Sequence, residues 1–68
     1  MQSLGSYLRA CRIARGMTQE ELGQAVGYTP GVAYKIVQSW EHDRQWIPMH
    51  RIRAVAKVLQ IPVESLIP

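Results

Sequence analysis

The sequence predicts an all-α fold, a compact bundle of about five short helices, in a single domain that covers residues 1–68. Three observations lead to this prediction. Apolar residues recur at the three-to-four-residue spacing of one helix face in several successive segments. Helix-capping residues and glycines separate these segments. No alternating apolar and polar run, and no hairpin turn, indicates a strand.

The first predicted helix follows Ser3, which can cap its start, and ends before Gly16. Leu4, Leu8 and Cys11 form one apolar stripe along it. Because Cys11 lies on this stripe, it is interpreted as a small core residue. It is also the only cysteine, so an internal disulfide is excluded.

The second predicted helix starts with a capping box. Thr18 is followed three residues later by Glu21, so each side chain can satisfy a backbone N–H that the helix leaves free. Met17 and Leu22 occupy the flanking apolar positions that fix the entry angle of the chain. The helix is expected to end at Gly27. Its inward-facing residues are predicted to be Leu22, Ala25 and Val26.

Gly23 lies in the middle of this second helix. A glycine inside a helix costs up to about 1 kcal/mol relative to alanine, so a packing reason is expected. The close approach of another helix at this position would supply that reason.

Three further helical segments are predicted. Thr29 is a second predicted helix cap, and Pro30 follows it at the first helical position, where proline is favoured. The buried stripe after them comprises Ala33, Ile36, Val37 and Trp40. A fourth helix of roughly 49–59 carries Ile52, Val55, Ala56 and Leu59 inward. The segment 62–66 allows one short turn, with Ile61, Val63 and Leu66 apolar.

The composition and the absence of certain motifs restrict the classes of function that are expected. Eight Lys and Arg against five Asp and Glu give a net charge of +3, which favours an anionic partner, most often nucleic acid. The sequence has no signal peptide and no apolar run of membrane-spanning length, so no membrane partner is expected. It shows no nucleophile–base pairing and no phosphate-binding glycine loop, and His42 and His50 lack a ligand set for a metal. An enzyme, a metal and a cofactor are therefore not expected.

An ordered series of motifs runs through nearly the whole chain. It consists of Leu8, Cys11 and Arg12 before Gly16, then Thr18-Gln19-Glu20-Glu21-Leu22-Gly23, Val26-Gly27, Val37-Gln38-Ser39-Trp40-Glu41, Pro48, and Ala54 to Leu59 followed by Ile61 and Leu66. This series resembles the lambda-repressor/Cro-like (XRE-type) helix-turn-helix domains. The resemblance implies that the second helix of the motif, within about 29–42, lies in the major groove of DNA.

The chain departs from that family in the spacing of the motif. About six residues usually separate the glycine of the turn from the buried Val or Ile of the recognition helix, whereas Gly27 and Val37 are ten apart. Either the turn 28–32 is longer, or the helix starts at Thr29 and runs one turn further. Four residues preserve the helical phase, so both alternatives remain open. Asp43 also stands where the family usually has glycine after Trp-Glu.

The resemblance implies a set of DNA-contacting residues. Under both alternatives, base contacts are expected from Tyr34, Lys35 and Gln38. If the turn is longer, Ser39 is expected to contact bases as well. If the helix is longer, Thr29 and Gly31 are expected to do so instead. Phosphate contacts are expected from Gln19, Thr29, Arg44, Arg51 and Arg53. Arg12 and Glu41 match the positions of a partly buried structural salt bridge in the family.

The function that the resemblance implies is transcriptional regulation by a Cro-like repressor, which binds a palindromic double-stranded DNA operator as a homodimer. The expected setting is the cytoplasm of a bacterial or phage-infected cell, with a phage or mobile-element origin and no small-molecule effector. Trp46 and Ile47 either cap the core or join Ile61, Val63 and Ile67 in a dimer contact. The alternative function is an antitoxin-like or adaptor module that grips a protein.

Overall fold

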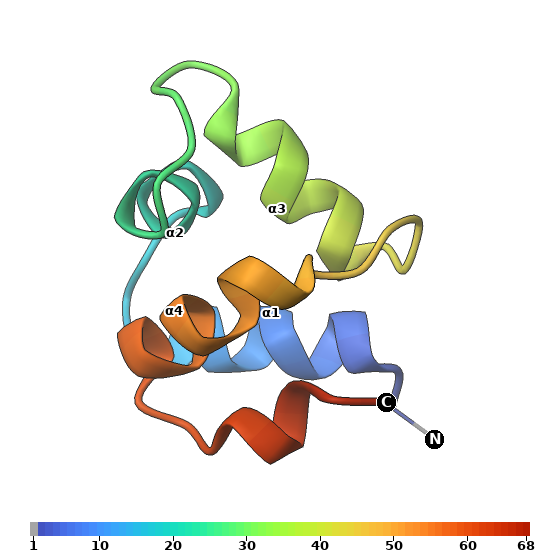
Figure 1. Ribbon diagram of the computed structural model, residues 1–68. Coiled ribbons are helices and arrows are strands. Elements are labelled where there is room, and N and C mark those ends of the chain that lie inside the picture. Colours follow the sequence, from blue (N-terminus) through green and yellow to red (C-terminus); the bar gives the residue numbers. More distant parts are fainter. Residues whose placement is uncertain (1) are drawn as a thin grey trace.

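The computed structural model describes residues 2–68. Within them are four α-helices, α1 (Leu4–Ala14), α2 (Gln19–Ala25), α3 (Ala33–Glu41) and α4 (Met49–Leu59), and one short 3-10 helix, η1 (Val63–Leu66). The same residues contain no strand. The predicted all-α fold is confirmed, and the fifth predicted helical piece is a 3-10 turn. In Figure 1, α2 and α3 lie above α1 and α4, and η1 lies below them. The start of α1 lies near the C-terminus, since Leu4 and Pro68 line the same hollow.

One hydrophobic core joins all of these elements. Its fully buried side chains come from α1, α2, α3, α4 and η1, and the largest are Trp40, Leu8, Leu22, Leu59, Leu66, Val37 and Val55. Tyr28 packs edge-on against Trp40, with 5.7 Å between the ring centroids. Cys11 lies partly buried against the core, as its interpretation requires. Leu22 in α2 and Val26 directly after it are buried as predicted. Ala25 is exposed, so its predicted inward position is wrong, and Gly23 is the other buried residue of α2.

The predicted caps hold the first two helices. The Ser3 hydroxyl accepts a hydrogen bond from the Ser6 N–H at 3.1 Å, and Gly16 ends this segment with φ of +69°. The capping box is present in both directions, since Thr18 N donates to Glu21 Oε1 at 2.8 Å and Glu21 N donates to Thr18 Oγ1 at 3.0 Å. These contacts are local, which is why residue spacing alone could predict them.

The loop between α3 and α4 packs back onto the core. Asp43 adopts a left-handed conformation with φ of 58°, which aspartate tolerates better than most residues, and so replaces the family's glycine. Its Oδ1 also accepts a hydrogen bond from Gly5 N at 2.9 Å. Ile47 is buried in the core, and Trp46 Nε1 donates to the Leu66 carbonyl at 2.8 Å. The core-capping alternative therefore describes both residues.

Along residues 2–68, no helix is both long enough and apolar enough to cross a membrane.

Candidate functional site

The structure chooses between the two alternatives for the helix-turn-helix segment. Helix α3 begins at Ala33, so the extra residues lengthen the turn, which arches above α2 in Figure 1. The alternative in which the helix starts at Thr29 is excluded, because Gly31 has φ of +91°, a conformation outside the α-helix. The Thr29 carbonyl instead accepts from Val32 N at 3.2 Å and Ala33 N at 3.1 Å. The base contacts that depended on the longer helix, from Thr29 and Gly31, are therefore withdrawn.

Helix α3 presents a polar face to solvent. Ala33, Val37 and Trp40 are buried on its inner side. On the outer side Tyr34 is 40% exposed, and Lys35 and Gln38 are also exposed. Ser39 is only partly exposed, at the border of this face. The four residues predicted to contact bases thus share the outward side of one helix, which lies at the edge of the molecule in Figure 1.

Helices α2 and α3 touch through their backbones at Gly23. A Cβ atom added to Gly23 would lie 2.5 Å from the Ala33 Cβ and 2.8 Å from the Ala33 carbonyl oxygen. Both are closer than ordinary van der Waals contact. The predicted close approach of a second helix is therefore confirmed, and the second helix is α3.

A buried network fixes the C-terminal end of α3. Arg12 Nε lies 2.7 Å from Glu41 Oε2, and Arg12 Nη2 lies 3.2 Å from Glu41 Oε1. The same guanidinium donates to the Met17 carbonyl at 2.8 Å, just before α2. The two charged residues are 8% and 7% exposed. The ion pair expected from the resemblance is present, and it ties α1, the start of α2 and the end of α3 together.

Gln19 joins this network. Its Nε2 donates to Glu41 Oε1 at 3.1 Å, so one of its two amide hydrogens is used internally. Gln19 is partly exposed, and its contact with a phosphate stays a prediction.

Of the arginines expected at phosphates, Arg51 has an internal placement. Its Nη1 donates to the Val26 carbonyl at the end of α2, and its guanidinium carbon lies 4.4 Å from the centroid of the Tyr28 ring. Its Nε is buried without a hydrogen-bond partner among residues 2–68. A side chain at Gly27 would meet this guanidinium. Arg51 therefore braces the start of the long turn, a role that its sequence position did not indicate.

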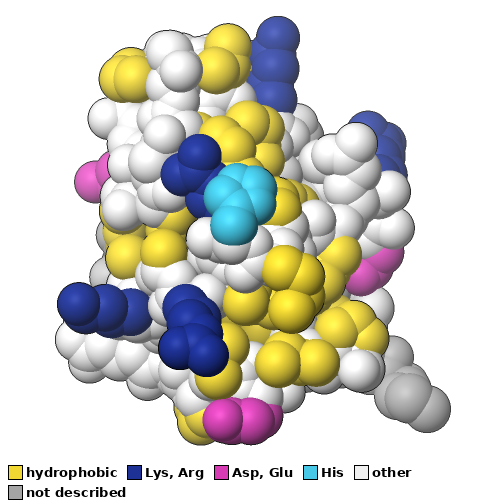
Figure 2. Space-filling view, in the orientation of Figure 1, with side chains coloured by type: hydrophobic (Ala, Val, Ile, Leu, Met, Phe, Trp, Pro, Cys, Tyr) yellow, Lys and Arg dark blue, Asp and Glu magenta, His cyan; other side chains and the backbone are white. Residues whose placement is uncertain are grey.

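Arg44 and Arg53 are exposed, as a phosphate-contacting role requires. Figure 2 shows several separate Lys and Arg side chains on one face, with hydrophobic side chains between them. Phosphate contact by Arg44 and Arg53 stays a prediction.

Sequence reasoning missed Glu20, which holds the N-terminal end of α3. Its Oε2 accepts hydrogen bonds from Gly31 N at 2.8 Å and Gln24 Nε2 at 2.6 Å, and its Oε1 accepts from Tyr34 N at 3.0 Å. The Gly31 N–H, followed by the Gln24 amide, lowers the pKa of the Glu20 carboxyl below its ordinary value of 4.5. Only the Gln24 contact follows helix spacing, so no local pattern could reveal the other two.

This pKa shift predicts a pH dependence. Because the pKa of Glu20 is lower in the folded than in the unfolded state, the carboxylate stabilises the fold fully above its ordinary pKa. That contribution is lost as the pH falls through the folded value. We expect an NMR titration to give a Glu20 midpoint below 4.5, with the Gly31 and Tyr34 amide signals following it. A midpoint at or above 4.5 would contradict the three hydrogen bonds.

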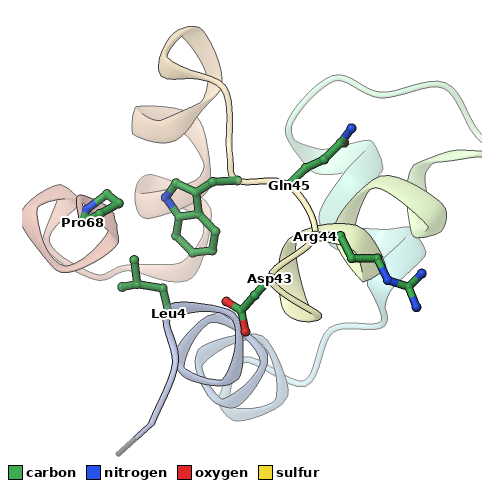
Figure 3. A pocket seen from close by; sticks show the side chains of 6 residues that line it. Leu4, Asp43, Arg44, Gln45 and Pro68 are labelled. Carbon is green, nitrogen blue, oxygen red and sulfur yellow. The ribbon is translucent and has the colours of Figure 1, made fainter.

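A shallow hollow lies between the start of α1, the loop after α3 and the C-terminus, lined by Leu4, Asp43, Arg44, Gln45, Trp46 and Pro68. In Figure 3 the side chains of Arg44 and Gln45 point away from Leu4 and Pro68. Throughout residues 2–68, no group of three or more His, Cys, Asp or Glu side chains is placed to hold a metal ion.

The comparisons with known proteins agree on one family, the helix-turn-helix proteins. A family model described as helix-turn-helix matches residues 8–66. An uncharacterized HTH-type transcriptional regulator of Sinorhizobium medicae (strain WSM419) is 30% identical over 60 residues, which is 88% of this chain and 40% of the relative. A regulator of Rhizobium meliloti (strain 1021), with the same description, matches to the same extent. The chain thus spans about two fifths of these relatives' length. No solved structure gives a significant match.

Proposed function

Since the chain belongs to the helix-turn-helix family, of the XRE type, we propose that it is a sequence-specific DNA-binding transcriptional regulator that reads the major groove with α3. The observation that carries this proposal is the outward polar face of α3, Tyr34, Lys35, Gln38 and Ser39, on a helix that is held at both ends. Because contacts with the rest of the protein fix both ends of α3, its outward side chains would meet the base edges in one fixed orientation.

The side chains on this face suit base recognition. The Gln38 amide can form a bidentate pair of hydrogen bonds with adenine, and Lys35 can donate to the O6 and N7 acceptors of guanine. Tyr34 can pack on a thymine methyl group or donate to a phosphate. Arg44, Arg53 and Gln19 would add phosphate contacts, which set affinity and register but not sequence choice.

The finer function that we propose is repression by a homodimer on a palindromic operator, in the cytoplasm of a bacterial cell. Two recognition helices bind half-sites on one face of the duplex when their centres lie about 34–36 Å apart. The core formed by these 68 residues is small, and pairing with a second copy would stabilise it.

Selection from a pool of random duplexes, followed by a salt titration on the enriched sequence, tests the proposal. We expect a palindromic sequence that binds about 10³-fold or more tightly than random duplex at the same salt concentration. Salt-sensitive binding without any enriched sequence would refute it and favour the protein-binding alternative.

Replacing Gln38 by alanine is expected to relax specificity at one base pair of each half-site, by about 1–3 kcal/mol, because the paired contact with the base is lost. The measurement is the dissociation constant for the enriched duplex and for its single-base variants. Gln2→Ala, the same change at an exposed position before α1, is the control and should leave the base preference unchanged. An equal loss on enriched and random duplexes would assign Gln38 to a role other than base recognition.

A further inference from the structure

The first turn of α3 lacks a cap of its own. The first N–H groups of an α-helix have no partner within the helix and are usually satisfied by the side chain of the N-cap residue. The N-cap residue here is Val32, whose side chain cannot accept a hydrogen bond. The Ala33 N–H donates to the Thr29 carbonyl, and the Lys35 N–H donates to the Val32 carbonyl. The Tyr34 N–H is left for another element.

Helix α2 supplies the missing acceptor through Glu20. One carboxylate oxygen accepts from Tyr34 N at 3.0 Å, while the other accepts from Gly31 N at 2.8 Å. Gln24, one turn further along α2, donates to the second oxygen at 2.6 Å and holds the carboxylate in place. A single side chain thus fixes both the long turn and the N-terminal end of the helix after it.

We propose that Glu20 is a positioning residue for DNA recognition, because its carboxylate sets the place of the first turn of α3, and with it Tyr34 and Lys35, relative to α2. This inference rests on the proposed function. The carboxylate of Glu20 does not contact DNA in this account. Its negative charge opposes the approach of phosphates, so its positioning effect and its charge effect on DNA binding have opposite signs.

The opposite signs allow a decisive test with Glu20→Gln. Glutamine keeps the size of the side chain but has one acceptor oxygen, so one of the two backbone N–H groups would face an amide N–H. We expect binding to the enriched duplex to weaken about fivefold, the size of effect that loss of a helix cap produces. Binding to random duplex should stay the same or tighten. Glu64→Gln, the same charge change at an exposed residue of η1, is the control and should not weaken binding to either duplex.

Hydrogen exchange of the backbone amides gives a second readout. In Glu20→Gln, faster exchange is expected at Gly31 and Tyr34, and unchanged exchange at Val55 in the core. Weakened specific binding together with this local change supports the proposal. An unchanged ratio of enriched-duplex to random-duplex affinity, or unchanged exchange at both amides, overturns it. A wild-type protein that enriches no sequence would refute the DNA-reading function itself, and exchange would then still decide whether Glu20 holds α3.

Discussion

Replacing Glu41 by alanine is expected to lower the free energy of unfolding by about 3–5 kcal/mol. The reason is that Arg12 would remain buried with an uncompensated charge, retaining only its contact with the Met17 carbonyl. A folded unit of this many residues typically has a total stability of about 3–10 kcal/mol. The loss of Glu41 would therefore remove much of that stability, independently of any effect on DNA binding.

Urea denaturation of the wild-type and Glu41→Ala proteins measures this effect. Glu64→Ala removes an exposed carboxylate from η1 and should change the midpoint little. A double variant, Arg12→Met with Glu41→Leu, should recover part of the loss, because apolar side chains replace a buried ion pair more easily than one partner is removed. Equal midpoints for wild type and Glu41→Ala would show that the pair contributes nothing to the fold.

Replacing Gly23 by valine is the second large change. The new Cβ would meet both the side chain and the backbone of Ala33, so α2 and α3 would have to separate. Overpacking of this kind typically costs about 1–3 kcal/mol. The displacement would also move the outer face of α3 and disturb the Glu20 contacts across the same crossing. We therefore expect lower stability together with weakened binding to the enriched duplex.

Ala25→Val is the matched control for this substitution. It introduces valine into the same helix at an exposed position, so it reports the lower helix propensity of valine alone. Denaturation and duplex binding of both variants separate the two effects. If Gly23→Val and Ala25→Val behave alike, the close crossing at Gly23 has no energetic importance.

Local patterns predicted most of the fold. The capping box at Thr18 and the apolar stripe of α4 depend on residues three or four apart, so spacing alone reveals them. The bounds predicted for α4 agree with the structure. The close helix contact at Gly23 could be predicted because a glycine inside a helix is unfavourable unless close packing requires it. The Arg12–Glu41 pair came from the family resemblance, since 29 residues separate its partners.

The features that position the site were harder to predict, because they depend on contacts between distant segments. Glu20 lies 11 residues from Gly31 and 14 from Tyr34, and Arg51 lies 25 residues from Val26. The start of α3 was open for the same reason. Thr29 and Pro30 carry a valid local start signal, and the left-handed conformation of Gly31 overrides it.

The central claim is that the outer face of α3 contacts DNA, and the most direct test is an NMR titration of the protein with the enriched duplex. We predict that the largest amide and side-chain shifts fall on Tyr34, Lys35, Gln38 and Ser39, with smaller shifts at Gln19, Arg44 and Arg53. Largest shifts on η1 or on the outer side of α1, with α3 unaffected, would contradict the claim.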